Sequence, residues 1–311
     1  MKELTLQIRE VARGLKFPEG PIAMPDGSIV AVEIMGNLVR VTPDGTRHVI
    51  AELGGGPNGA AIGPDGKAYV CNNGGFSWHV ADDGYMRPTG RAEAYAGGRI
   101  ERVDLTTGKV ETLYTHCGDD PITGPNDIVF DGLGGFWFTD HGKSYGRLMD
   151  RGALFYAKAD GSFIKEVAFP LFTPNGVGLS PDGKTLYVSE TDTGRLWSFP
   201  VLGPGELAKE PWPSPNGGRF LGNLPGYHRF DSMAIEANGN ICVATLVSGG
   251  ITVFSPEGEA LEYHKAPEGY CTNICFGGPD LKTAYITLSG YGTLVAVDWP
   301  RPGLALHHLN R

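Results

Sequence analysis

The sequence has no run of about 18 apolar residues, the length that a helix needs to cross a bilayer, so we expect no membrane span. Its first ten residues alternate apolar and polar side chains and lack the apolar core of a secretory signal. Basic residues number 26 against 35 acidic ones and form no cluster, so nucleic acid is not an expected partner. No glycine-rich phosphate-binding motif follows a predicted strand, so no nucleotide cofactor is expected.

Cysteine is scarce and odd in number, with 5 residues, several of them inside apolar runs. Such thiols are typical of reduced, buried side chains, so we expect a cytoplasmic protein without a disulfide framework. Cys271 and Cys275 have no second Cys/His pair at zinc-finger spacing, which argues against a zinc knuckle.

Glycine is abundant, with 47 residues, and so is proline, with 23, although 41% of the chain is hydrophobic. This composition indicates many tight turns between short buried segments. It argues against a helical bundle, a coiled coil and a disordered chain.

The chain contains an internal repeat. Six segments each consist of a polar residue, a short apolar stretch, a turn such as PDG and a second apolar stretch, at residues 19–33, 58–72, 126–140, 175–190, 231–245 and 273–287. Each is followed by a further hairpin-like segment, the fourth with a degenerate return, at residues 37–53, 98–114, 152–169, 194–202, 249–264 and 292–309. Apolar runs separated by such turns are typical of β-hairpins, so each repeat predicts four strands.

Four strands repeated six times predict an all-β fold, a six-bladed β-propeller with four-stranded antiparallel blades, as one domain over residues 1–311. A parallel β-helix is the alternative, but its rungs are shorter than these repeats. We expect a strand at about residues 4–12 to complete the last blade; whether residues 304–309 join that sheet is open. Insertions at about 74–97 and 203–230 are expected to be loops, either decoration or a lid over one end of the channel.

The residue before the first strand of every repeat carries a side-chain oxygen. These residues are Glu19, Asn58, Asn126, Asn175, Asp231 and Asn273. Because first strands line a propeller's axis, we expect the six to converge at one end of the channel. Each could instead bond its own turn, but six matched positions favour a shared site. Carboxylate and amide oxygens suit calcium, magnesium or manganese, and the two acids would balance a divalent ion.

Several strings resemble the senescence marker protein/gluconolactonase/regucalcin family over nearly the whole chain. They are FPEGP (17–21), PND (125–127), PNGVGLSPDGKTLYV (174–188), DSMAIEANGNICVA (231–244) and TNICFGGPDLKTAYIT (272–287). The resemblance implies a six-bladed propeller that hydrolyses sugar lactones with one divalent metal ion. It assigns Glu19, Asn175 and Asp231 as metal ligands, and Asn126 as a fourth ligand or a contact to metal-bound water and substrate. Calcium is the first expectation, with magnesium, manganese or zinc as alternatives.

The chemistry expected is opening of a small-molecule lactone, with the metal polarising the carbonyl and Asp231 acting as base or nucleophile. Asn126 and His141 are the other catalytic candidates; His141 either moves protons or is a loop histidine bonded to backbone. Tyr227 and His228 are candidates to cover the site. The family's arginine before the Asn-Asp pair is replaced here by Thr123-Gly124-Pro125, which favours a substrate less polar than an aldonolactone, helped by Phe76 and Trp78.

Two other functions compete with the lactonase interpretation. One is a non-catalytic binding or scaffold propeller, which would not need two carboxylates at the axis. The other is an organophosphate hydrolase that uses the same metal site. The sequence does not indicate an oligomeric state.

Overall fold

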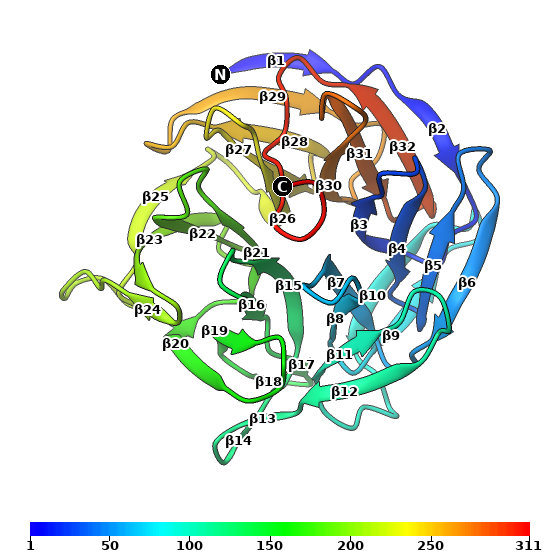
Figure 1. Cartoon of the computed structure of the whole chain (residues 1–311). Helices are drawn as coiled ribbons and strands as arrows, with labels where there is room; N and C mark the ends of the chain where they lie inside the picture. Colours follow the sequence, from blue (N-terminus) through cyan, green and yellow to red (C-terminus); the bar gives the residue numbers. More distant parts are fainter.

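The computed structural model describes residues 1–311, which form strands and turns and no α-helix. Six small sheets stand in a ring around a central axis, which confirms the predicted six-bladed β-propeller (Figure 1). No segment forms a helix capable of spanning a membrane.

Each of the first three blades has four antiparallel strands from the axis outward. Blade 1 contains β3 (Pro18–Ala23), β4 (Ile29–Glu33), β5 (Asn37–Val41) and β6 (Arg47–Glu52). Blade 2 contains β7 (Pro57–Ile62), β8 (Ala68–Asn72), β11 (Arg99–Val103) and β12 (Val110–Tyr114). Blade 3 contains β15 (Pro125–Phe130), β16 (Gly135–Asp140), β19 (Gly152–Lys158) and β20 (Ile164–Leu171).

The other three blades vary at their outer edge. Blade 4 contains β21 (Pro174–Leu179), β22 (Thr185–Glu190), β23 (Arg195–Gly203), β25 (Arg219–Asn223) and the short β24 (Glu206–Leu207). Blade 5 contains β26 (Arg229–Ile235), β27 (Ile241–Leu246), β28 (Gly250–Phe254), β29 (Ala260–Lys265) and β1 (Lys2–Thr5). Blade 6 contains β30 (Cys271–Gly277), β31 (Thr283–Leu288), β32 (Thr293–Asp298) and β2 (Arg9–Ala12).

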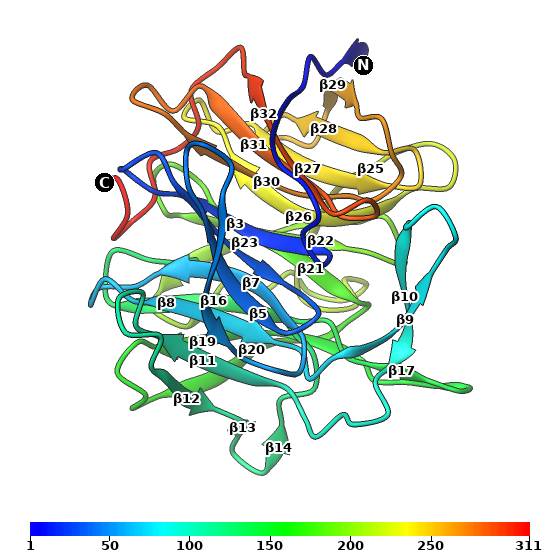
Figure 2. The same cartoon turned by 90° about the vertical axis from the view of Figure 1, so that its right-hand side faces the viewer.

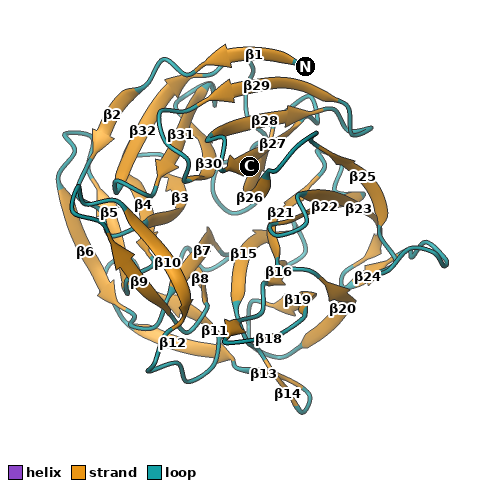
Figure 3. Cartoon of the chain, turned by 180° about the vertical axis from the view of Figure 1, so that it is seen from behind, coloured by secondary structure: helices purple, strands orange, loops and turns teal.

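The N-terminal segment closes the ring, but not as one strand. β2 pairs antiparallel with β32 and completes the last blade, as predicted for residues 9–12. The prediction is wrong for residues 4–5, because β1 pairs in parallel with β29 of blade 5. Between the two strands Leu6 is buried in the core shared by blades 5 and 6 and donates its N–H to Lys265 O at 3.0 Å. The segment therefore ties both blades together (Figure 3).

The two insertions have different structures. Residues 74–97 contain the hairpin β9 (Phe76–Val80) and β10 (Met86–Arg91), which stands on one face of the propeller (Figure 2). The expectation that 203–230 is only a loop is wrong, because residues 219–223 are the fourth strand of blade 4. There Phe220 packs against Trp197, with ring centroids 5.8 Å apart. Two small hairpins, β13–β14 (His116–Cys117 and Asp120–Pro121) and β17–β18 (Ser144–Tyr145 and Leu148–Met149), complete the elements.

The C-terminal tail, residues 304–311, belongs to no sheet. It crosses the end of the channel on the face opposite the β9–β10 hairpin (Figures 1 and 2). Leu304 donates its N–H to Ile235 O at 2.8 Å, at the end of the innermost strand of blade 5. The question left open for residues 304–309 is thus answered: they cover the channel instead of extending blade 6.

Candidate functional site

All six innermost strands have a register shift near the residues predicted to converge. The shifts lie between Glu19 and Ile22, Pro57 and Ala60, Pro125 and Ile128, Pro174 and Val177, Phe230 and Met233, and Cys271 and Asn273. Such bulges redirect side chains and are frequent beside active sites. The same distortion in every blade therefore supports the prediction that these positions share one location.

Glycines allow neighbouring innermost strands to come close at this end of the channel. A Cβ atom on Gly59 would lie 2.4 Å from Asn126 O, and one on Gly20 would lie 2.6 Å from Asn58 O. Gly20 also has a φ of 50°, a backbone conformation that residues with a side chain disfavour. The oxygen-bearing side chains of blades 1, 2 and 3 therefore start from closely spaced backbones.

Hydrogen bonds connect members of the oxygen ring, by which we mean Glu19, Asn58, Asn126, Asn175, Asp231 and Asn273. Asn273 Nδ2 donates to Glu19 Oε2 at 2.6 Å, and Gly20 N donates to the same oxygen at 2.8 Å. Asn175 Nδ2 donates to Thr191 Oγ1 at 3.0 Å, and its Oδ1 accepts from Ser232 Oγ at 3.3 Å. Asn273 thus donates a hydrogen bond that positions Glu19, whereas its sequence position alone predicts a metal ligand.

The two ring carboxylates are near enough for the charge of Glu19 to act on Asp231, and neither forms an ion pair, although the charge of Arg229 also acts on Asp231. Burial raises the pKa of Glu19 to about 6. Burial, and secondly the charge of Glu19, raises the pKa of Asp231 well above its usual range. Two buried acids that repel each other are an arrangement that a bound divalent cation would relieve.

Asn126 adds a third feature at the ring. Its Oδ1 atom is buried and has no hydrogen-bond partner. A buried acceptor left unpaired costs about 1–3 kcal/mol, so such atoms usually serve a ligand. No group of three or more His, Cys, Asp or Glu side chains is arranged to hold a metal ion, which leaves a mixed set of carboxylate and amide oxygens as the candidate donors. This set fits a hard cation such as calcium.

His141 follows β16 and lies at the same end of the channel. Burial lowers its pKa to about 4; the carboxylate of Asp192 opposes this shift, whereas Lys143 and Arg229 add to it. The imidazole is therefore neutral near pH 7, and so low a pKa makes it a weak proton acceptor. His228, in contrast, bonds Ser248 Oγ at 3.1 Å and Pro225 O at 3.0 Å, and Tyr227 is 71% exposed.

Several residues at this end were not singled out from the sequence. Arg229 Nη2 donates to Asp192 Oδ1. Phe17 contacts both Trp78 and Tyr270, with ring centroids 4.9 and 5.6 Å apart. For Arg229, its position two residues before Asp231 was the only sequence signal of a place near the site. The aromatic contacts join residues far apart in sequence, so no sequence pattern could predict them.

Lys143 is buried, and its Nζ donates to Asn73 Oδ1 at 2.9 Å and to Gly75 O at 3.0 Å. The same atom lies 3.8 Å from the centre of the Phe76 ring. Lys143 thus fixes the base of the β9–β10 hairpin and covers a face of Phe76. At the hairpin's other end Met86 N bonds Gly290 O at 2.8 Å in blade 6.

Fold and site together define a β-propeller protein with one oxygen-lined channel end suited to a hard divalent cation. Comparison with known proteins goes further: the chain belongs to the SMP-30/gluconolactonase/LRE-like family, whose model matches residues 17–290. It is 25% identical to a gluconolactonase from Zymomonas mobilis, with 88% of this chain and 77% of the relative aligned. It is 29% identical to lactonase drp35 from Staphylococcus saprophyticus, with 66% of this chain and 55% of the relative aligned.

The fold is also that of solved structures. A calcium-binding protein, regucalcin, from Agrobacterium tumefaciens matches with a TM-score of 0.74 and 18% identity, covering 98% of this chain and 100% of that one. At this identity the likeness concerns the fold alone.

Proposed function

We propose that the protein is a lactonase that depends on one divalent metal ion bound at the oxygen ring. The observation that carries the proposal is the buried Glu19–Asp231 pair beside the unpartnered Oδ1 of Asn126. Relatives named gluconolactonase and lactonase supply the reaction class; the chain aligns with 77% of the first and 55% of the second.

Glu19, Asn175 and Asp231 would hold the ion, with Asn126 as a fourth ligand or a substrate contact. Calcium fits the all-oxygen donors best, and the regucalcin structure is titled as calcium-binding; magnesium, manganese and zinc are the alternatives. When bound, the cation supplies Lewis acidity that polarises the lactone carbonyl.

The remaining chemistry belongs to side chains. Asp231 would take a proton from the water that attacks the carbonyl carbon, or would attack that carbon itself to form an acyl-enzyme that water then hydrolyses; in either case the ring C–O bond breaks and its oxygen takes up a proton. Asn126 would offer Oδ1 to the ion and Nδ2 to the substrate. His141 would move the released proton towards solvent only transiently, because its lowered pKa disfavours the protonated form.

The test measures acid release from γ- and δ-lactones by metal-free protein, and again after calcium, magnesium, manganese or zinc is added back. We expect turnover only with metal, and an Asp231→Asn variant should be inactive while keeping its far-UV circular dichroism. Chelator-resistant turnover, or an active Asp231→Asn variant, would show that the site assignment is wrong. If no lactone is hydrolysed with any metal, the binding or scaffold function takes its place.

We also propose a cytoplasmic location, supported by the five cysteines, which are all free thiols. Cell fractionation tests this location, and detection of the protein outside the cytoplasm would contradict it.

A further inference from the structure

Side chains from all six blades lie around the end of the channel that holds the oxygen ring, and the two halves of this border differ in chemistry. Blades 3, 4 and 5 contribute polar groups: His141, Asp192 and Arg229. Blades 6, 1 and 2 contribute aromatic rings: Tyr270, Phe17 and Trp78, the last from the β9–β10 hairpin. We call this border the rim.

The aromatic half is a continuous wall. Phe17 stands between Trp78 and Tyr270, and Tyr85 extends the wall by packing on Tyr270 with centroids 5.8 Å apart. The hairpin end is held against blade 6, because Tyr291 Oη donates to Asp83 Oδ2 at 3.0 Å. The wall is therefore preformed and suits a flat apolar group.

The polar half is organised around Arg229. This residue lies two positions before Asp231 on β26, just ahead of the register shift that follows Phe230, and its positive charge acts to lower the pKa of the Asp231 carboxyl. Phe230 between them is fully buried in the core. Arg229 uses Nη2 for Asp192, and its Nε and Nη1 make no hydrogen bond. Donor groups thus remain open to solvent beside the proposed metal ligand.

The ion pair determines which polar group fits. A guanidinium next to a carboxylate offers donors and acceptors side by side with no net charge. A substrate hydroxyl can accept from Arg229 and donate to Asp192, whereas a free carboxylate would be repelled by Asp192. Lys143, another cation near the rim, is buried and its Nζ donates to Asn73 and Gly75, whereas Arg87 on β10 is near enough to Tyr270 for its charge to act on that side chain.

We propose that Arg229, positioned by Asp192, is the specificity-determining residue that binds a hydroxyl on one edge of a neutral lactone, while Trp78 and Tyr270 contact a flat apolar part on the opposite edge. The inference rests on the proposed lactonase function and adds its substrate class: lactones that carry both a hydroxylated and an apolar edge.

The experiment compares three neutral six-membered lactones on the metal-loaded protein: δ-valerolactone as reference, glucono-δ-lactone for hydroxyls and 3,4-dihydrocoumarin for a flat ring. For Arg229→Met we expect the kcat/KM ratio of glucono-δ-lactone to δ-valerolactone to fall about 10- to 100-fold, mainly through KM. The ratio for 3,4-dihydrocoumarin should not fall. Trp78→Leu should show the reverse pattern.

Arg219→Met is the matched control, because Arg219 is exposed on β25 and has no ionic partner. Arg229→Lys keeps the charge without the planar fork and should recover part of the lost ratio, which separates binding from misfolding. An unchanged hydroxyl ratio in a folded Arg229→Met protein would overturn the inference and leave the lactonase proposal standing. Wild-type protein that hydrolyses none of the three lactones with any metal would overturn both.

Discussion

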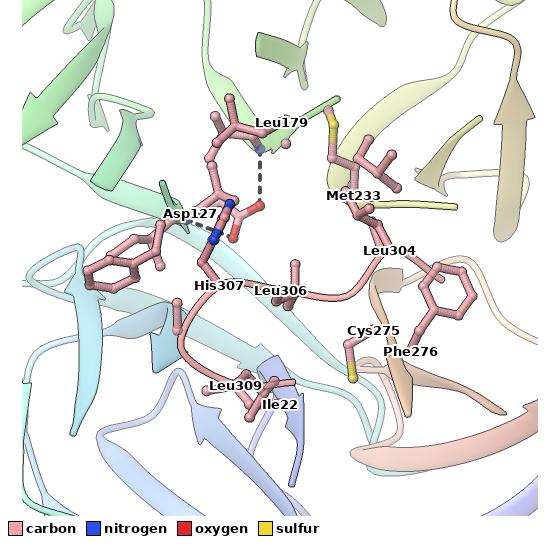
Figure 4. Close-up of a pocket in the computed structure, with 18 of the residues that line it drawn as sticks. Ile22, Asp127, Leu179, Met233, Cys275, Phe276, Leu304, Leu306, His307 and Leu309 are labelled. Atoms are coloured by element: carbon pink, nitrogen blue, oxygen red, sulfur yellow. Dashed lines mark hydrogen bonds between the residues drawn. The ribbon is translucent and has the colours of Figure 1, made fainter. Parts of the chain in front are cut away.

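The two ends of the central channel are formed by the same six strands and have opposite chemistry. At the end where these strands begin, the side chains carry oxygens, and at the end where they finish, the side chains are Ile22, Ile62, Phe130, Leu179, Ile235 and Phe276, all buried. The C-terminal tail covers the apolar end, and Leu304, Leu306 and Leu309 line a cavity of about 120 Å³ there (Figure 4).

This contrast shows that the channel is polar at one end and sealed at the other. We expect ions and neutral polar substrates to enter at the oxygen-lined end, because the transfer of a charge into the apolar end would cost free energy. We therefore expect substitutions at the oxygen ring to change activity, and substitutions at the tail to change stability.

The largest effect is expected from Glu19→Gln. Loss of one of two carboxylates should weaken metal binding and reduce lactone turnover about 1,000-fold, since a bound cation contributes several kcal/mol to the transition state. Calcium should raise the melting temperature of the wild type, because a ligand that binds only the folded state stabilises that state. It should not raise the melting temperature of the variant.

Without metal, Glu19→Gln should unfold at or above the wild-type temperature, because the substitution removes repulsion between two buried acids. A variant that is much less stable without metal would mean that Glu19 is a structural group and not a metal ligand. Glu52→Gln, the same substitution at an exposed position of β6, is the matched control.

At the apolar end, deletion of residues 304–311 should lower the free energy of unfolding by about 3 kcal/mol, since it uncovers apolar side chains from several blades. Urea denaturation measures the loss. Turnover by the folded fraction should change little, because no tail residue hydrogen-bonds a member of the oxygen ring, although Asn273 lines the same cavity as the tail.

A thiol reagent gives a second readout of the same deletion. Cys275 lines the covered cavity, and burial raises the pKa of its thiol to about 12. It should react slowly in the full chain and quickly after deletion. Equal labelling rates would show that the tail does not seal this end.

The sequence was sufficient to predict the ring of blades, because each repeat has its own turn and apolar pattern. It also placed the oxygen ring at one end, since equivalent positions in a repeat occupy equivalent positions in the fold. It was not sufficient for contacts between repeats. Asn273 bonds Glu19, which is 254 residues away, and nothing local to either residue distinguishes a support from a ligand.

One wrong prediction and one open question have physical causes. Proline and glycine are frequent in residues 203–230 and predict a loop, yet packing of Phe220 on Trp197 makes 219–223 a strand. Apolar and polar residues alternate only weakly over residues 304–309. Leu304 and Leu309 are partly buried because they cover the open end of the channel, and this end exists only in the assembled ring.

Lys143 offers a pH test of the oxygen-lined end. Burial lowers its pKa to about 7, below the usual 10.5, so between these values the unfolded chain holds the extra proton and rising pH favours the folded state. The stability of the wild type relative to Lys143→Met should therefore increase by about 2 kcal/mol from pH 7 to pH 9. Urea denaturation at three pH values measures it; Lys184→Met, at an exposed site, should show no such trend. If the free energies of unfolding of the wild type and of Lys143→Met changed equally with pH, the lowered pKa of Lys143 would be contradicted.

The smallest effect is expected from Leu306→Ala at the sealed end. Leu306 lines the cavity but remains 41% exposed, so its truncation should cost less than about 1 kcal/mol and leave lactone turnover unchanged. The informative outcome would be a loss of activity. Asp127 lines the same cavity, follows Asn126 directly and accepts from Val177 N at 3.1 Å in the next blade. Activity lost on Leu306→Ala and equally on Asp127→Asn would mean that the two ends communicate through this carboxyl, and that the apolar end is more than a seal.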